Sequence, residues 1–353
     1  MRIGILNGDD IGHEIVPETV KVMQVAAEAT GVHIDWEPIP IGRQAYDTLG
    51  NTMPAGTLDR LTALDGWILG PIGHMVYPKV AEAPNPHPIL RKHFDLFANI
   101  RPVKSYPDLP SVHQGVDLVI VRENNEGFQP DRNVVAGCGE FRPTHDVTIS
   151  VRVITRNGSS KVARAAFELA RTRRKHLTVV HKDTVFKLGC GMFVEECRKL
   201  AAEYPEVQLD EAIVDTFAMR LVMTPQRYDV IVTTNMFGDI LTDEAAGLVG
   251  GLGMAPGLCA GPQHAMAQAT HGSAPDIAGR NIANPYAMIM SGKMLLDWLG
   301  RRHGDAAAVN AARRIEHAVE RVLAERRSLT PDLGGSGTTT SMGDAVVAAL
   351  RAE

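Results

Sequence analysis

The chain has 353 residues, of which 44% are hydrophobic, and it carries a formal net charge of −5 at pH 7. This length exceeds the usual size of a single hydrophobic core and predicts two domains or one large α/β unit. Lysine and arginine are scattered along the chain rather than gathered in runs, so the sequence has no electrostatic signature for nucleic acid or an anionic membrane.

The cysteines indicate a reducing compartment. Cys138, Cys190, Cys197 and Cys259 show no metal-ligand spacing and are too few for a disulfide framework. We therefore expect free thiols in a cytoplasmic protein. The chain begins with an apolar run too short for a signal peptide, and glycine and proline interrupt the uncharged stretch 245–262, so we expect no membrane span.

Strands and helices alternate through the first third of the chain. Hydrophobic periodicity predicts strands over residues 3–6, 32–38 and 66–70, and helices from Glu14 toward Ala29 and over 58–64. This alternation indicates a parallel sheet. The first strand is followed by the turn 7–13, which lacks the Gly-x-Gly-x-x-Gly of a Rossmann dinucleotide site.

Three arginines follow in the next segment. We expect an ordered proline-rich loop over 78–88, a helix over 89–101 and a strand over 116–121, which places Arg91, Arg101 and Arg122 near the ends of elements. A guanidinium binds a carboxylate with two parallel hydrogen bonds, so convergence of the three would suit a di- or tricarboxylate. Any one of these arginines, taken alone, is more often a surface side chain.

A group of acidic residues suggests a metal site. The apolar run 228–234 predicts a buried strand, and helical spacing after Gly238 puts Asp239 and Asp243 on one helical face. A third carboxylate, Asp215, lies one strand earlier. Such oxygen ligands suit Mg²⁺ or Mn²⁺. The alternative is a helix N-terminus whose early acids complement the helix dipole.

Longer motifs occur in a fixed order along nearly the whole chain. They are NGDDIGHE (7–14), LFANIRP (96–102), VRENNEG (121–127), HK (181–182), IVTTNMFGDILTD (231–243), AGLVGGLG (246–253), HGSAPDIAG (271–279), IANP (282–285) and TPDLGG (330–335). This set resembles the family of β-decarboxylating dehydrogenases that holds isocitrate, homoisocitrate, 3-isopropylmalate and D-malate or tartrate dehydrogenases. The resemblance implies an α/β, isopropylmalate dehydrogenase-like two-domain fold with a mixed sheet.

The resemblance also implies roles for single residues. Arg91, Arg101 and Arg122 match the arginines that hold the carboxylates of a malate core. Asp215, Asp239 and Asp243 match the metal-binding acids, and Asp215 is expected from the second subunit of a homodimer. Lys182, also from that subunit, matches the lysine that helps to take the proton of the C2 hydroxyl. Without the resemblance, Lys182 reads as a solvated lysine.

The loop 271–285 matches the family's cofactor loop. The candidate cofactor-binding residues are His271, Gly272, Ser273, Ala274, Pro275, Asp276, Ile277 and Asn284. Asp276 stands where NAD-using members carry an aspartate, which accepts the ribose hydroxyls and repels a 2′-phosphate. We therefore expect NAD, although composition alone would also fit a glycine-rich surface turn.

The chain departs from the family pattern at several positions. Gln129 stands where the family's catalytic tyrosine is expected, and glutamine has no proton to give near neutral pH. Thr184 replaces a common asparagine, Asp10 a common glycine, and His74 lies in a loop that usually bears threonine. These departures keep open a binding or regulatory paralogue without full turnover.

The residues before Arg91 bear on the substrate. Asn85 and His87 favour a polar or anionic group at C3 of the malate core, because burying a carboxylate against alkyl groups is costly. We expect homoisocitrate or isocitrate rather than 3-isopropylmalate, with D-malate and tartrate as further alternatives.

The same resemblance implies the domain organisation. Residues 1–99 and 254–353 should form a large domain that carries the NAD loop, and residues 100–253 a smaller one. Alternation over 147–153 predicts a strand in an arm of about residues 130–156 that clasps the second subunit. Amphipathic helices are expected over 306–324 and 342–350.

Overall fold

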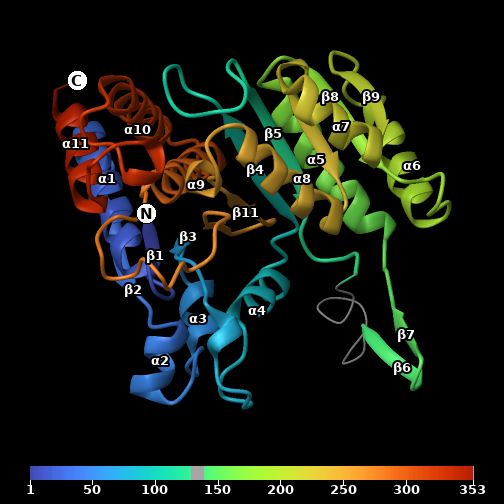
Figure 1. The fold of residues 1–353 in the computed structure, drawn as a ribbon, viewed down its shortest axis with the longest axis horizontal. Helices are drawn as coiled ribbons and strands as arrows, with labels where there is room; N and C mark the ends of the chain where they lie inside the picture. The colour runs from blue at the N-terminus through green and yellow to red at the C-terminus, as the bar shows by residue number, and fades with distance from the viewer. Residues whose placement is uncertain (129–138, 353) are drawn as a thin grey trace.

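The computed structural model describes residues 1–128 and 139–352, and in these ranges one ten-stranded sheet runs through the molecule (Figure 1). Its strand order is β2-β1-β3-β12-β11-β4-β5-β10-β8-β9, with helices on both faces. Both parallel and antiparallel pairs occur in it. The α/β class and the mixed sheet predicted from the sequence are therefore confirmed.

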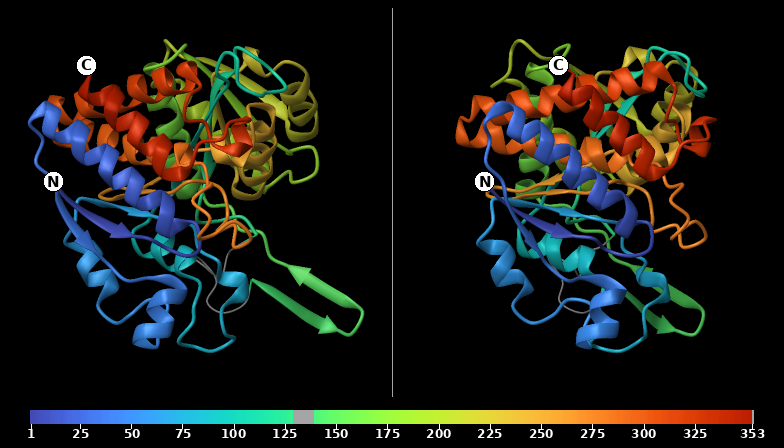
Figure 2. Two further views of the ribbon diagram at one scale, coloured as in Figure 1. Left: turned by 60° about the vertical axis from the view of Figure 1, so that its left-hand side comes forward. Right: turned by 90° about the vertical axis from the view of Figure 1, so that its left-hand side faces the viewer.

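The first half of the sheet joins the two ends of the chain. Its strands are β1 (Arg2–Leu6), β2 (Asp35–Pro38), β3 (Gly66–Leu69), β11 (Leu258–Ala260) and β12 (Ala265–Ala267). One face packs on α1 (Gly12–Thr30), α9 (Tyr286–His303), α10 (Ala306–Glu325) and α11 (Thr339–Arg351), as Figure 2 shows. The other face packs on α2 (Gly42–Leu49), α3 (Thr57–Thr62) and α4 (Pro86–His93).

The second half of the sheet comes from the middle of the chain. Its strands are β4 (Ala98–Lys104), β5 (Asp117–Glu123), β8 (His176–His181), β9 (Gln208–Ile213) and β10 (Val230–Thr233). Helices α5 (Arg156–Arg171) and α6 (Gly189–Ala201) cover one face. Helices α7 (Val214–Met223) and α8 (Asn235–Leu248) cover the other. Short 3₁₀ turns span His74–Val76, Pro225–Arg227, Leu252–Met254 and Pro331–Leu333.

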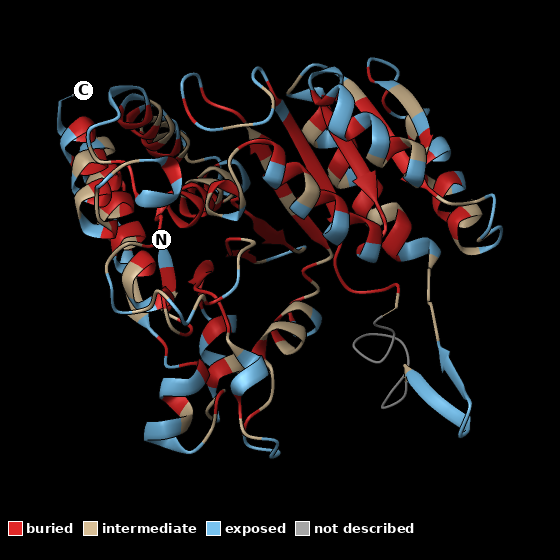
Figure 3. Cartoon of the chain, viewed as in Figure 1, coloured by how far each residue is buried: buried red, intermediate tan, exposed pale blue. Residues whose placement is uncertain are grey.

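Buried residues occur in both halves of the molecule (Figure 3), and the hydrophobic ones among them form clusters that follow this division. Two clusters belong mainly to the chain ends, and two others to the segment from Ala98 to Val249. The predicted domain boundaries at 99 and 254 fit this grouping and stay a prediction. The described cysteines, Cys190, Cys197 and Cys259, are buried and unpaired. Within the described ranges, none of the helices combines the length and the apolar character needed to cross a membrane.

The helix predicted over 89–101 is wrong. The helix α4 starts earlier, at Pro86, because the Asn85 side chain caps it by accepting from the backbone N–H of His87 at 3.1 Å. It ends at His93, and Asp95 takes the left-handed φ of 46°. Residues 98–104 then form β4 in the middle of the sheet, so Arg101 lies within a strand. Residues 86–88, predicted as the end of the loop 78–88, therefore belong to α4.

A two-stranded antiparallel hairpin projects from the body of the molecule (Figures 1 and 2). It consists of β6 (Glu140–Thr144) and β7 (Val147–Ser150), and all of these residues are exposed. The strand expected over 147–153 thus ends at Ser150. Residues 129–138 of the predicted arm lie outside the described residues.

The helix α8 approaches β5 so closely that only glycine fits at the contact. A Cβ added at Gly238 would lie 2.6 Å from Cγ and 2.7 Å from Cβ of Arg122. Alanine normally stabilises a helix interior relative to glycine by about 1 kcal/mol. At Gly238 we expect alanine to lower the stability instead, because its methyl group must displace Arg122 or the helix.

We predict that Gly238→Ala lowers the free energy of unfolding by about 1–3 kcal/mol, measured by urea denaturation. Gly247→Ala is the matched control, since it lies on the same helix with nothing within 4 Å of the added Cβ. It should leave stability unchanged or raise it by up to about 1 kcal/mol. Equal effects of both substitutions would contradict the proposed close contact.

The last residue of β5, Glu123, is buried and holds the turn that follows. Its carboxylate accepts hydrogen bonds from the backbone N–H groups of Asn125 at 2.7 Å and Glu126 at 2.9 Å, and from the Asn235 side chain at 3.4 Å. Burial raises the pKa of Glu123 from 4.5 to about 7. A raised carboxyl pKa favours the fold at low pH, and this contribution is lost as the pH rises through 7.

We predict that Glu123→Gln, which is neutral at every pH, gains stability relative to the wild type between pH 5 and 8. The gain across this range should reach about 3 kcal/mol at most, measured as the difference in unfolding free energy at each pH. A difference that does not change with pH would show that Glu123 does not titrate in this window.

Candidate active site

A cavity of about 280 Å³ lies where the two halves of the sheet meet. The segment after β3, the start and body of α4, β4, β5, α8 and the segment after β12 contribute its lining residues: Ile72, His74, Asn85, His87, Arg91, Asn99, Arg101, Arg122, Asp239, Gln268, Ala269, Thr270, His271 and Gly272. The fold thus brings together the three predicted arginines and the predicted substrate residues Asn85 and His87. It adds the predicted metal ligand Asp239 and the start of the predicted cofactor loop.

Arg101 and Arg122 lie on neighbouring strands and are almost fully buried. Only 6% of the surface of Arg101 and 3% of the surface of Arg122 is exposed. Arg101 donates from Nη1 to Thr242 Oγ1 at 2.6 Å and from Nε to Asn99 Oδ1 at 3.2 Å. Arg122 donates to the Asp239 carboxylate and, from Nη2, to Asn235 Oδ1 at 2.7 Å. These contacts fix both guanidinium groups in one orientation.

The electrostatic cost of this arrangement is visible in the pKa values. Burial, and then the positive charge of Arg101, lower the pKa of Arg122 to about 9. Burial also lowers the pKa of Arg101, against the opposing effect of Asp239. Arg91 adds a like charge near both. Buried positive charges that lie close together favour a bound anion, because the anion would offset their desolvation and mutual repulsion.

Two guanidinium nitrogens lack a hydrogen-bond partner in the part of the chain that the structure describes. Arg91 Nε and Arg122 Nε are buried without a hydrogen-bond partner among the described residues. Arg91 lies in the last turn of α4 and donates from Nη2 to Gln268 Oε1 at 3.2 Å. Buried donors are normally satisfied, so the open nitrogen of Arg91 points to an anionic ligand in this cavity.

The two acids of α8 lie together, as their spacing predicted. Arg101 Nη1 is 3.4 Å from Asp239 Oδ1 and 3.9 Å from Asp243 Oδ1. Burial raises the pKa of Asp243, and the neighbouring charge of Asp239 adds to this effect. Half-exposed carboxylates on one helical face are a fitting pair of ligands for a hard divalent cation. In the described ranges of this one chain, no third His, Cys, Asp or Glu completes a metal-binding group with them.

Lys182 and Asp215 form a separate pair. Lys182 Nζ lies 2.6 Å from Asp215 Oδ1, and this hydrogen bond lowers the pKa of Asp215. Lys182 follows β8, Asp215 lies in the first turn of α7, and neither lines the cavity. Within one chain the predicted site residues therefore fall into two groups. The expected contribution of Lys182 and Asp215 to the site of a second subunit stays a prediction.

The predicted cofactor loop is held against the start of α1. The backbone N–H of Ile11 donates to Ser273 O at 3.2 Å, and the N–H of Gly279 donates to the Glu14 carboxylate. His271 Nε2 is buried without a partner among the described residues, and burial lowers the pKa of this imidazole. Asp276 is exposed at the tip. An open imidazole nitrogen and an exposed carboxylate fit the adenine and ribose of a dinucleotide.

The remaining loop residues have mixed surroundings. Ser273 is buried, Ala274 and Ile277 are half-buried, and Gly272 and Pro275 are exposed. Asn284 donates to Asp332 at 2.9 Å and accepts from the backbone N–H of Tyr286, so it anchors the start of α9. Its expected contact with adenine is not tested by these bonds.

Sequence reasoning missed several residues of the cavity. Asn99 and Gln268 line it, while Thr242 and Asn235 hold the arginines. Thr242 and Asn235 stand inside the motif 231–243, and Asn99 inside 96–102, so motif membership was the available signal. Gln268 follows a three-residue strand and carried no such signal. Gln129, where the family has a tyrosine, lies outside the described residues.

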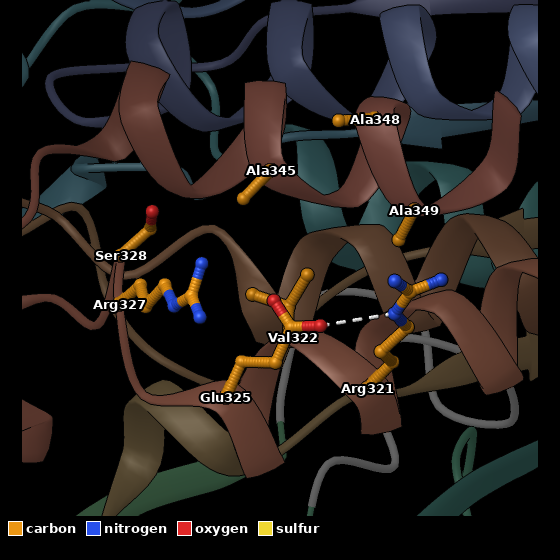
Figure 4. Close-up of a pocket in the computed structure, with 8 residues that line it drawn as sticks. All are labelled: Arg321, Val322, Glu325, Arg327, Ser328, Ala345, Ala348 and Ala349. Carbon is orange, nitrogen blue, oxygen red and sulfur yellow. Dashed lines mark hydrogen bonds and ion pairs between the residues drawn. The ribbon is translucent and has the colours of Figure 1, made fainter. Parts of the chain in front are cut away.

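A second cavity, of about 230 Å³, lies between α10, the loop after it and α11 (Figure 4). Three alanines contribute to its wall, together with the charged residues Arg321, Glu325 and Arg327, of which Arg321 and Glu325 pair at 3.0 Å. It contains none of the residues predicted for the site. We therefore place the candidate active site in the arginine-lined cavity.

The chain is similar to known dehydrogenases over nearly its whole length. The family model for isocitrate/isopropylmalate dehydrogenase matches residues 2–346. The isocitrate/homoisocitrate dehydrogenase of Thermus thermophilus is 42% identical over 99% of this chain and 98% of its own length. The 3-isopropylmalate dehydrogenase of Archaeoglobus fulgidus is 38% identical over 99% of both chains. The crystal structure of isocitrate dehydrogenase from Methylococcus capsulatus superimposes with a TM-score of 0.84 at 40% identity, again over 99% of both.

These matches confirm the resemblance, the fold class and the enzyme class inferred from the sequence. The chain belongs to the isocitrate/isopropylmalate dehydrogenase family and is an oxidoreductase that acts on a hydroxy acid with decarboxylation.

Proposed function

We propose that the protein catalyses the NAD-dependent oxidative decarboxylation of a malate that carries an anionic substituent at C3, with homoisocitrate or isocitrate preferred. The observation that carries this proposal is the cavity's set of three arginines. Arg101 and Arg122 are buried, and the Nε atoms of Arg91 and Arg122 are buried without a hydrogen-bond partner among the described residues. Such a set matches the charge and the planar geometry of several carboxylates on one small molecule.

Substrate binding follows from the charges of the cavity. Arg91, Arg101 and Arg122 hold the carboxylates, and Asp239 offsets only part of their charge through its contacts with Arg101 and Arg122. His87 and Asn85 stand at the wall near Arg91 and present polar atoms to the C3 substituent. Both residues are polar and half-buried, so an apolar substituent packed against them would remove water from polar atoms without replacing its hydrogen bonds, which disfavours it.

Asp239 and Asp243, with Asp215 of a second subunit, would hold Mg²⁺ or Mn²⁺. A divalent cation at this place supplies Lewis acidity to the oxygen at C2 and to the carboxylate beside it. The protein's own part is to keep the two α8 carboxylates on one face and close to Arg101. This arrangement fits the cation only in a homodimer, which we include in the proposal.

The loop from His271 to Asn284 would hold the adenosine half of NAD, with Asp276 on the ribose hydroxyls. NAD supplies the hydride acceptor when it is bound. The carboxylate of Asp276 would repel a 2′-phosphate, so NAD is preferred to NADP. Lys182 of the second subunit would take the proton of the C2 hydroxyl. It can do so only as the neutral amine, so its ion pair with Asp215 must be exchanged for the contact of Asp215 with the cation.

A binding or regulatory paralogue is the second candidate. The observation in its favour is Gln129, which cannot donate a proton to the carbon left after loss of CO₂. In that case the acid and NAD would bind, and turnover would be absent or would stop after the first half of the reaction.

The test is NADH formation by the purified protein with Mg²⁺ or Mn²⁺, across homoisocitrate, isocitrate, 3-isopropylmalate, D-malate and tartrate. We expect turnover to be highest with homoisocitrate or isocitrate, to be lost with EDTA and to return when the cation is restored. NADP should be used at least about 10-fold less efficiently than NAD.

Two results would contradict the proposal. Turnover that prefers 3-isopropylmalate would disprove the anionic substituent. Calorimetric binding of an acid without turnover of any of the five would favour the paralogue instead.

A further inference from the structure

One residue of the cavity, Gln268, joins two groups on α4. It is buried, with 7% of its surface exposed, and follows directly after β12. Its backbone N–H donates to Gly257 O at 3.0 Å, which fixes the start of the side chain. The side-chain amide then contacts both Arg91 and His87.

The chemistry of this bridge determines which atom faces which partner. Arg91 and His87 are four residues apart on α4 and so lie on one helical face. A guanidinium only donates hydrogen bonds, so Gln268 Oε1 must accept from Arg91 Nη2, as it does at 3.2 Å. The amide nitrogen then donates to His87 Nε2. This ring nitrogen acts as an acceptor and carries no proton while the bridge holds.

The bridge gives Arg91 a neutral partner, so it does not offset the charge of the guanidinium. A carboxylate at position 268 would accept from the same nitrogen and cancel the positive charge. It would also favour a proton on His87 Nε2, because a carboxylate accepts and does not donate. Asp239, the one acid among the cavity's described lining residues, is engaged by Arg122 and Arg101. The neutral amide therefore keeps this end of the cavity positive.

We propose that Gln268 is a positioning residue that makes the C3 end of the cavity select a substituent bearing a carboxylate. It orients Arg91 and His87 together and adds no negative charge beside the substituent. This inference rests on the proposed function and deepens it, because it names the residue that sets the class of substrate. A carboxyalkyl group at C3 is the chemistry recognised.

The test compares Gln268→Glu with the wild type on acids that share the malate core. Glutamate has the length of glutamine and adds one negative charge. We expect the ratio of kcat/KM for isocitrate or homoisocitrate to kcat/KM for D-malate to fall at least about 10-fold. Most of this fall should come from KM, since the reacting atoms are not touched.

Two further variants separate charge from folding. Gln263→Glu adds the same charge on the exposed turn between β11 and β12 and should leave the ratio unchanged. Gln268→Met keeps the volume without bridging, so it should lower the ratio less than glutamate does. If Gln268→Glu does not fold, as judged by its thermal melting, the ratio for Gln268→Met decides.

The outcomes are distinguishable. A ratio that stays at the wild-type value in both Gln268 variants, with equal losses for every acid, would overturn the role of Gln268 and leave the proposed function intact. A wild-type protein that neither binds nor turns over any of the acids would overturn the proposed function, and this inference with it.

Discussion

The burial of Arg101 and Arg122 side by side is the constraint on which the rest of the site depends. Two guanidinium groups on adjacent central strands are costly to bury, and the protein offsets that cost only in part through Asp239, Asn235 and Thr242. All three of these partners come from α8. The helix must therefore lie against β5 and β4 at a distance that only Gly238 permits.

This contact links the fold to the chemistry. The middle segment supplies β4, β5 and α8, whereas the chain ends supply α4, Gln268 and the loop that begins at His271. The cavity exists because the antiparallel pairs β11–β4 and β4–β5 join the two halves of the sheet in this order. Relative movement of the two halves would change the distance between Arg91 and the other two arginines. Substrate carboxylates that span the three would favour one arrangement of the halves.

Much of this architecture was predictable, and the failures have physical causes. Strands with continuous apolar runs, such as 230–233, and helices with strong periodicity, such as α10, were found because burial imposes those patterns. The helix predicted over 89–101 was wrong because the apolar residues of this segment also fit helical spacing. Residues 98–104 form a strand because they pair with β5 and β11. Local sequence carries no information about those partners.

The candidate site shows the same limit. Arg101, Arg122 and Asp239 were predicted within long motifs, and Arg91 within the basic segment before them. They converge because α4, β4, β5 and α8 meet at the cavity. Gln268 was missed because a single polar residue after a three-residue strand has no periodic or motif signal. Its role appears only when its two contacts on α4 are known.

The central claim is that one chain holds half of a site and that a second chain supplies Lys182 and Asp215. Mixing two inactive variants tests it most directly: Asp239→Asn, which damages a chain's own half, and Lys182→Met, which damages the half it lends. After dissociation and random re-pairing, half of the dimers would be mixed, each with one intact site, so about a quarter of the wild-type activity should return. A mixture that stays as inactive as its components would contradict a site shared between subunits.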